Sequence, residues 1–280
     1  MEEGFDDSLK RLYLIGQRTI NKCSMNVSSS SRNICVVGAT SGIAEQTIYL
    51  LATKNHNLIL LARDQAKLSV ITDAAEKLGN GVVKQVVTDL QTIDNASELL
   101  DNVQRQLGDL DTLVVCHGYL GNQSLAEQDL HELEKMITLN FTSVAALAMA
   151  ARHKLIQSKH SHPVLLAIGS VAGDRGRAKS YVYGACKNAL ATLFEGIKHD
   201  ITSKNEKLHV VLVKPGKTDS PMTQGFSKDG PLWSTTHTIA SCIVKAIDGK
   251  RSVVYAPGYW RYVLFVIRQL PYGLFNRLGL

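Results

Sequence analysis

The sequence is poor in cysteine, and none of its cysteines stands in a CxxC pair. The five that are present, Cys23, Cys35, Cys116, Cys186 and Cys242, are odd in number and widely spaced. This distribution argues against a disulfide framework or a zinc site and favours reduced thiols in the cytoplasm. We therefore predict no metal centre.

Long apolar runs are also lacking. No stretch reaches the ~18–20 uninterrupted apolar residues that a membrane-spanning helix needs. The first residues, MEEGFDD, are acidic and precede only the short mixed segment LKRLYLIG, whereas a secretory signal has a basic start and a longer apolar run. We therefore expect a cytoplasmic protein without a secretory signal.

The overall composition is that of an ordinary globular protein. The 280 residues are 45% hydrophobic and 20% charged, enough for one large α/β domain or two small ones. The formal charge of +6 and the pI near 9.0 suggest a negatively charged partner: nucleic acid, a membrane surface or a phosphorylated small molecule. We discount nucleic acid, because the chain has no aromatic-basic platform and no recognised nucleic-acid module.

The first 32 residues look like an appendage that closes with the polar run Ser28-Ser29-Ser30-Ser31-Arg32. Two interpretations stay open. One is a loosely ordered tail, with Met25 as a candidate start. The other is a short amphipathic arm through LKRLYLIGQRTI.

From residue 33 onward, short apolar runs alternate with helical patterns. Strands are expected at 33–39, 57–62, 82–89, 111–118, 163–170, 209–216 and 252–257, and helices at 44–54, 64–78, 97–108, 127–157, 181–203 and 236–248. Such alternation implies βαβ units and a parallel sheet covered on both faces. We predict a Rossmann-type doubly wound α/β domain of seven strands over residues 33–256.

A glycine-rich turn follows the first expected strand and opens the first helix. Its small residues would let the backbone approach a pyrophosphate, whose charge sits at the helix N-terminus. The predicted cofactor-binding residues here are Gly38, Thr40, Ser41, Gly42 and Ile43.

The ends of the next two strands bear on the choice of cofactor. Arg63 holds the second strand's end, where an arginine suits a 2′-phosphate and a carboxylate suits the ribose hydroxyls. We therefore favour NADP (NADPH) over NAD, although the adjacent Asp64 leaves open NAD, or two solvated loop charges. Asp89 ends the third strand and is predicted to contact the adenine or to cap the following turn.

With these motifs the chain resembles the short-chain dehydrogenase/reductase family over about residues 33–256. Val37–Ala44 correspond to the family's TGxxxGxG motif, and Val115–Gly118 correspond loosely to its NNAG motif. Asn140 corresponds to the family's helix asparagine and Ser170 to its strand serine. Tyr183–Lys187 correspond to YxxxK, and Pro215-Gly216 with Ser220 to the PG-plus-hydroxyl motif. The resemblance implies a nicotinamide-dependent oxidoreductase. It also implies cofactor contacts from Gly118, Tyr183, Lys187, Pro215, Gly216 and Ser220.

Four positions depart from the family pattern. Val115 and Cys116 replace asparagines that brace the central sheet, so the brace must differ in this chain. His117 replaces an alanine beside the cofactor, as a packed loop residue or, as the alternative, a catalyst. Ser220 replaces a threonine and keeps the hydroxyl.

Helical spacing selects one of two tyrosines in SYVYGACK as the partner of Lys187. Residues four apart share a helix face, and residues six apart do not, so Tyr183 qualifies and Tyr181 does not. A nearby ammonium and the oxidised nicotinamide ring would lower the pKa of the phenol from about 10.

The family gives this pair its partners. The resemblance implies that Tyr183 protonates the carbonyl oxygen as hydride arrives, and that Ser170 orients that oxygen. It further implies that Lys187 holds the nicotinamide ribose and that Asn140 supports a water link to Lys187.

Basic and flexible segments surround the expected site. The loop 173–179 carries Arg175, Arg177 and Lys179, which either hold a phosphate or are simply solvated. Lys214 and Lys217 flank Pro215-Gly216 and are expected to face cofactor or substrate. Residues 220–235 match the family's substrate flap, with Trp233 as an apolar contact or as an anchor for the next helix.

The tail, residues 257–280, is basic and aromatic. No acid follows Asp248, and Arg261, Arg268 and Arg277 interrupt an apolar pattern. It suits an interfacial helix on an anionic membrane, ended by Pro271, and the alternative is a helix buried in a dimer partner. We therefore expect peripheral contact with the inner face of the cytoplasmic membrane, and a homo-oligomer.

Such a tail, with SVAGDRGR, YVYGACK and LVKPGKTDSPMT, is similar to that of the family's decaprenylphosphoryl-keto-pentose reductases. This likeness implies a keto sugar carried on a polyprenyl phosphate. A long-chain lipid ketone such as 3-ketosphinganine is the alternative substrate. A non-catalytic, NADPH-binding scaffold at the membrane is the alternative function.

Overall fold

The computed structural model describes residues 31–92 and 95–277. By contacts the chain divides into two units, residues 1–30 and 31–280, and the sheet described next belongs to the second unit. The predicted tail or arm before residue 31, including Cys23 and Met25, lies outside the described residues. Arg32, which we predicted to belong to that appendage, is instead part of the domain. The residue is 4% exposed, and its guanidinium lies 3.6 Å from the Asp111 carboxylate.

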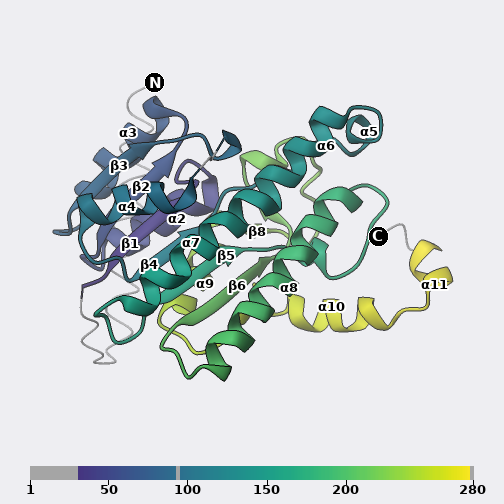
Figure 1. The fold of residues 1–280 in the computed structure, drawn as a ribbon. Coiled ribbons are helices and arrows are strands. Elements are labelled where there is room, and N and C mark those ends of the chain that lie inside the picture. The colour runs from purple at the N-terminus through teal and green to yellow at the C-terminus, as the bar shows by residue number, and fades with distance from the viewer. Residues whose placement is uncertain (1–30, 93–94, 278–280) are drawn as a thin grey trace. The chain divides into compact units, whose positions relative to one another are not determined.

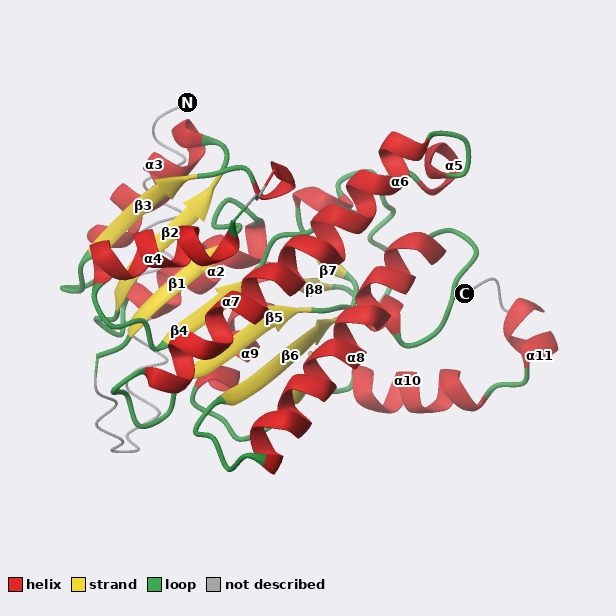
Figure 2. Cartoon of the chain, viewed as in Figure 1, coloured by secondary structure: helices red, strands yellow, loops and turns green. Residues whose placement is uncertain are grey.

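A seven-stranded parallel sheet in the order β3-β2-β1-β4-β5-β6-β9 forms the centre of the unit (Figures 1 and 2). Its strands are β1 (Asn33–Val37), β2 (Asn57–Ala62), β3 (Val83–Val87), β4 (Thr112–Val115), β5 (Val164–Ile168), β6 (His209–Pro215) and β9 (Val253–Ala256). The predicted Rossmann-type fold with seven strands is therefore confirmed. A separate two-stranded sheet pairs β7 (Thr218–Asp219) with β8 (Ser234–Thr235).

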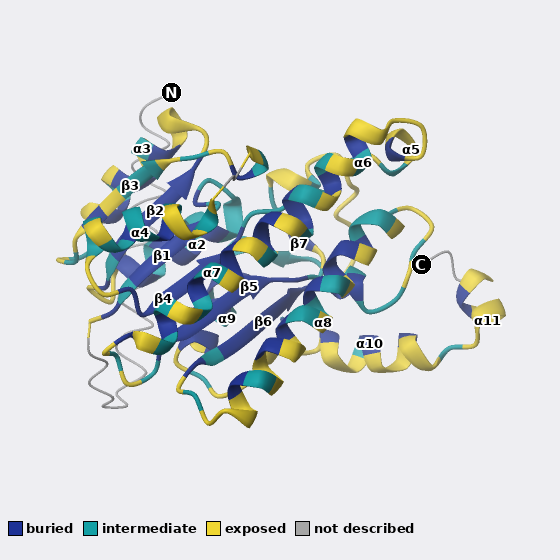
Figure 3. Cartoon of the chain, in the orientation of Figure 1, coloured by how far each residue is buried: buried dark blue, intermediate teal, exposed yellow. Residues whose placement is uncertain are grey.

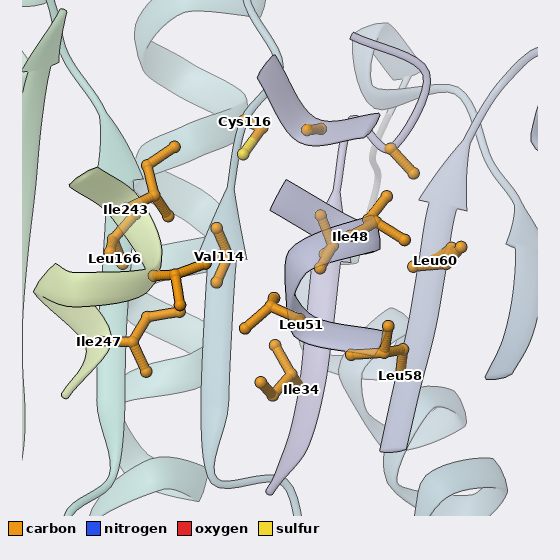
Figure 4. Close-up of a cluster of buried hydrophobic side chains, with 14 of the residues drawn as sticks. Ile34, Ile48, Leu51, Leu58, Leu60, Val114, Cys116, Leu166, Ile243 and Ile247 are labelled. Carbon is orange, nitrogen blue, oxygen red and sulfur yellow. The ribbon is translucent and has the colours of Figure 1, made fainter. Parts of the chain in front are cut away.

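Helices cover both faces of the sheet. One layer contains α2 (Gly42–Ala52), α3 (Gln65–Glu76) and α9 (Thr236–Ile247), and the other α4 (Ala96–Leu107), α7 (Ser143–Gln157) and α8 (Tyr181–Ser203). Successive strand residues point to opposite faces, so Ile34 packs under the first layer and Cys35 under the second. Figure 4 shows Ile48 of α2 and Ile243 of α9 against the strands. The inner strands are buried almost throughout, whereas the edge strands β3 and β9 are buried only in part (Figure 3).

The single helix predicted over 127–157 is wrong, because the structure divides this region. A short helix, α5 (Gln123–Ala126), ends before it, and the region itself contains α6 (Leu130–Ile137), a π-helical turn at Thr138–Thr142 and then α7. The Asp129 carboxylate accepts a bond from His131 N at 2.9 Å and starts α6 anew. In the π turn, the Ser143 hydroxyl donates to Thr138 O at 2.8 Å. Such π turns are frequent at functional sites, and this one contains Asn140.

The tail forms two helices, α10 (Trp260–Gln269) and α11 (Tyr272–Arg277), of which the second was not predicted. Trp260 and Leu264 are buried and pack with Val171, so the inner face of α10 rests on the domain. Its opposite face is exposed (Figure 3). Across residues 31–92 and 95–277, no helix combines the length and the apolar character needed to cross a membrane.

Candidate active site

A cavity of ≈ 680 Å³ opens at the carboxyl edge of the sheet, where the strand order reverses between β1 and β4. Ligands of open α/β sheets bind at this switch point. Nearly all predicted site residues line it, namely Gly38, Thr40, Ser41, Gly42, Ile43, Arg63, Asp89, Gly118, Ser170, Tyr183, Lys187, Pro215, Gly216 and Ser220. Asn140 does not line the cavity and lies behind its wall.

The glycine-rich turn forms one end of the cavity. Gly38 has φ +78°, and a Cβ there would lie 2.6 Å from His117 N, so a larger residue does not fit. Ser41 caps α2 by accepting a bond from Ala44 N at 3.2 Å. The first-turn amides of Gly42 and Ile43 have no acceptor within the helix and lie at the cavity wall, an arrangement that suits a phosphate.

The structure separates the roles of the acidic and basic residues beyond the second and third strands. The Asp64 carboxylate caps α3, where it accepts a bond from Lys67 N at 3.0 Å. Asp89 accepts a bond from Gln91 N at 3.0 Å, as the turn-capping interpretation expected, and also lines the cavity. Arg63 is exposed at the cavity.

Tyr183 and Lys187 lie on one face of α8, as the helical spacing predicted. The Lys187 Nζ is 5.6 Å from the Tyr183 ring centroid and donates to Ile168 O at 3.0 Å. Lys187 is only 2% exposed. Tyr181, in contrast, is 45% exposed and its hydroxyl donates to Glu127 Oε1 at 2.8 Å.

Burial dominates the electrostatics of this pair. Desolvation raises the pKa of Tyr183 to about 12, against a lowering interaction with the Ser170 hydroxyl. The lowering of this pKa that we expected from the ammonium is therefore wrong: burial sets the direction, and the opposing interaction comes from Ser170. Desolvation also lowers the pKa of Lys187 to about 8. At neutral pH the phenol therefore keeps its proton and most of Lys187 stays charged.

Asn140 fixes the loop that follows β4. Its Oδ1 accepts from Tyr119 N at 3.1 Å, while its Nδ2 donates to Tyr119 O at 2.6 Å and to Met136 O at 2.8 Å. Gly118 lies between the Asn140 side-chain amide and Lys187. A Cβ at position 118 would lie 3.1 Å from Asn140 Oδ1 and 3.4 Å from Lys187 Nζ. Glycine there keeps the two groups close.

His117 packs in the loop after β4 and also lines the cavity. Ser143 donates to Thr138 O, so His117 Nε2, 2.8 Å from the Ser143 hydroxyl, must donate to that oxygen. Burial and the nearby Lys187 lower the pKa of His117 to about 3, so the ring is neutral. Together with the Asn140–Tyr119 bonds, this link ties the β4 loop to the helices and supplies the brace that the missing asparagines would give.

The three cations of the 173–179 loop have different partners. Arg175 donates to Ile267 O and lies 4.0 Å from the Phe275 ring, so it holds the tail helices. Lys179 lines a separate pocket beside Glu127. Arg177 lines the main cavity.

The lysines that flank Pro215-Gly216 also differ. Lys214 pairs with Asp174 at 2.5 Å and is 8% exposed. It does not line the cavity, so the expectation that it faces cofactor or substrate is wrong. Lys217 does line it.

Several lining residues carried no sequence signal. Tyr119 and Leu120 belong to the irregular segment after β4, and Lys135 lies on α6, with Nζ 4.5 Å from the Tyr119 ring centroid. Helical periodicity identifies the packed face of α6 but cannot show that its end borders a cavity. From the predicted flap, Met222, Phe226 and Trp233 line the same cavity.

A parallel sheet in this order, with a glycine turn at its switch point, defines the Rossmann-type dinucleotide-binding class. The chain belongs to the short-chain dehydrogenase family, whose model matches residues 32–230, and it is a dehydrogenase/reductase enzyme. It is similar to an uncharacterized oxidoreductase of Staphylococcus aureus (strain USA300), 26% identical over 218 residues, which span 78% of this chain and 91% of the relative.

Two solved structures share the fold. A short-chain dehydrogenase/reductase from Burkholderia phymatum in complex with NAD has a TM-score of 0.77 and 16% sequence identity. The alignment covers 87% of this chain and 95% of that one. A short-chain dehydrogenase from Sphingobium yanoikuyae in complex with NADPH has a TM-score of 0.71 and 22% identity, with coverage of 88% and 95%.

Proposed function

We propose that this enzyme transfers hydride between NADP(H) and a ketone or secondary alcohol, with Tyr183 as the group that exchanges the proton. One observation carries the proposal. The buried Lys187 ammonium and the Tyr183 phenol meet at the cavity that also contains Ser170 and the glycine turn. A buried lysine without a carboxylate partner is costly, and such groups concentrate at functional sites.

The cavity residues fit a nicotinamide dinucleotide. Gly38 lines the cavity without a side chain, and the free amides of Gly42 and Ile43 suit the pyrophosphate. Two proteins of the same fold hold NAD or NADPH. When bound, the nicotinamide supplies or accepts the hydride.

Arg63 supports NADP over NAD. Its guanidinium is exposed at the cavity, whereas the competing Asp64 carboxylate is engaged as the cap of α3. A cationic fork at the end of the second strand favours a 2′-phosphate.

The side chains divide the acid–base work. Tyr183 is protonated at neutral pH and donates its proton to the carbonyl oxygen. The Ser170 hydroxyl, at the same wall, donates a hydrogen bond to that oxygen and fixes its position. The Lys187 charge favours the phenolate left behind, and Asn140 holds the β4 loop and its glycine against Lys187.

We further propose that residues 33–256 form the reductase domain and that the tail docks on an anionic membrane. The exposed side of the two tail helices carries large apolar residues, namely Tyr262, Phe265, Val266, Tyr272 and Leu274. Arg261, Arg268 and Arg277 are exposed beside them. Such a surface suits an interface with anionic headgroups, and a lipid-linked keto sugar is the substrate that it would present.

Purified protein incubated with NADPH and a membrane lipid extract tests the reaction, with the loss of nicotinamide absorbance as the readout. Tyr183→Phe should lower the rate by about 10²–10⁴-fold, because it removes the proton donor. Tyr181→Phe is the matched control and should keep the wild-type rate, since that hydroxyl bonds Glu127 on the surface. Equal rates for wild type and Tyr183→Phe would exclude the proposed acid.

A further inference from the structure

The cations that line the cavity are spread along it and are not gathered at its glycine end. Its lining cations are Arg63, Lys135, Arg177, Lys187 and Lys217, and among its lining residues the carboxylate is that of Asp89. Charge of one sign concentrated in a cleft favours ligands of the opposite sign.

The sheet order divides this charge between two ends. Arg63 and Asp89 follow β2 and β3, on the side of the sheet assigned to the adenosine half of the cofactor. Arg177 follows β5 and Lys217 follows β6, on the side that holds Ser170. The carboxylate that lines the cavity thus lies far along the sheet from Arg177.

Arg177 lacks a partner of its own. Within residues 31–92 and 95–277, its guanidinium makes no hydrogen bond or ion pair, and its Nε is buried. Burial lowers its pKa, an effect that Asp174 opposes. Asp174 itself is committed, because one carboxylate oxygen pairs with Lys214 at 2.5 Å and the other accepts from the Tyr255 hydroxyl at 2.6 Å. A largely desolvated, unpaired guanidinium is costly unless a ligand anion completes it.

We infer that Arg177 binds an anionic group on the substrate, a carboxylate or a phosphate, and that the enzyme acts on anionic ketones. The inference rests on the proposed function, because it places this anion in the cavity where Tyr183 and Ser170 take the carbonyl. The planar fork of arginine matches both anions. A substrate with an ammonium group, as in 3-ketosphinganine, is disfavoured by the same charge.

Matched ketones test the specificity. Acetoacetate and levulinate are compared with their methyl esters, and dihydroxyacetone phosphate with dihydroxyacetone, so that the two anion types form separate arms. In the wild type we expect kcat/KM for at least one anion to exceed that of its neutral partner about 10–100-fold, as for a charge-assisted bidentate contact.

Arg177→Gln should lower kcat/KM for the anionic ketones more than for their neutral partners, chiefly through KM, and Arg177→Lys should restore part of the preference. Lys179→Gln is the control, because it removes a cation from the same loop outside the main cavity. Neutral ketones used as well as their anionic partners by the wild type would overturn the inference and leave the reductase intact.

Calorimetry gives a readout that does not need turnover. Levulinate and dihydroxyacetone phosphate are titrated into the NADPH-mixed Tyr183→Phe protein, with and without Arg177→Gln. Binding that weakens about tenfold or more with Arg177→Gln supports the anion site, even if no ketone is reduced and the proposed reaction fails. Binding of both anions unaffected by Arg177→Gln, or no binding of either, overturns it.

Discussion

The indole of Trp260 occupies the space in which a side chain at Gly216 would begin. A Cβ at position 216 would lie 1.7 Å from Trp260 Nε1. Gly216 lines the cofactor cavity and Trp260 is the first residue of α10, so the tail packs directly against the cavity wall.

Gly216→Ala should therefore disturb both the fold and the cavity. Because the indole must move, we expect a loss of about 1–3 kcal/mol in the free energy of unfolding, with weaker NADPH binding. Urea unfolding and a fluorescence titration with NADPH measure the two effects. Gly258→Ala is the control, since a Cβ there meets nothing within 4 Å. Equal losses in both variants would show that the Trp260 contact is not the cause.

The sequence was a good guide wherever the signal is local. The strand at Asn57–Ala62 and the helix at Tyr181–Ser203 have the predicted bounds, because apolar period and capping act over a few residues. The i, i+4 spacing correctly placed Tyr183 beside Lys187.

Long-range contacts explain what could not be predicted. The break in the 127–157 helix serves Asn140, whose amide bonds a loop 21 residues away. The division of work among Arg175, Arg177 and Lys179 depends on Ile267 and on two different pockets, none of which is visible from residue spacing. Burial also reversed the expected direction of the Tyr183 pKa.

Lys187→Met should stabilise the protein while removing its activity. Burial lowers the Lys187 pKa from 10.5 to about 8, a shift that corresponds to roughly 3 kcal/mol of destabilisation below both values. A methionine fills similar volume without that cost. We expect the variant without cofactor to unfold at equal or higher urea concentration than wild type, with reduction lowered by about 10²-fold or more. A clear loss of stability would contradict the view that this charge is retained for function.

Arg63→Ala tests the preference for NADP. Removing a cation that pairs with a 2′-phosphate should raise the KM for NADPH about 10–100-fold and change that for NADH by less than about threefold. Asp64→Asn is the control, because asparagine can still cap α3. Parallel changes for the two cofactors in Arg63→Ala would mean that this side chain does not distinguish them.

The tail provides a test of membrane docking. Replacing Arg261 and Arg268 with Glu should release the protein from phosphatidylglycerol vesicles in a sedimentation assay, because each cation near such a surface contributes about 1 kcal/mol. Lys250→Glu with Arg251→Glu is the control: it makes the same change in net charge at the start of β9, whereas α10 follows the strand's other end.

Two results would count against this docking. Vesicle binding that the tail variant retains in full removes the electrostatic part of the proposal. A dimer seen by analytical ultracentrifugation, and dissociated by Tyr262→Ser with Phe265→Ser, would assign the apolar face to a second copy of the chain instead.

One buried histidine, His56, and two partly buried ones, His162 and His209, lie at the amino-terminal edge of the sheet. The rings of His162 and His209 stack with centroids 5.0 Å apart, and Arg32 donates to His162 O at 2.9 Å. Burial lowers the pKa of His56 to about 4 and that of His209 to about 4, and it lowers the pKa of His162 as well. The other charged groups that act on these rings are Arg32, Lys54, His160, Lys198 and Asp248.

These shifts predict that acid weakens the fold. An unfolded histidine titrates near pH ~6.5, so between about pH 6.5 and about pH 4 the unfolded chain binds more protons than the folded one, and stability falls as the pH falls through this window. His209→Phe keeps a ring against His162 without a titrating group, and it should lose less unfolding free energy between about pH 7 and about pH 5 than wild type does. The exposed His131, replaced by Gln, serves as the control and should follow wild type. Urea titrations at both pH values measure the loss of unfolding free energy. An identical loss in His209→Phe and in wild type would show that His209 does not contribute to acid unfolding.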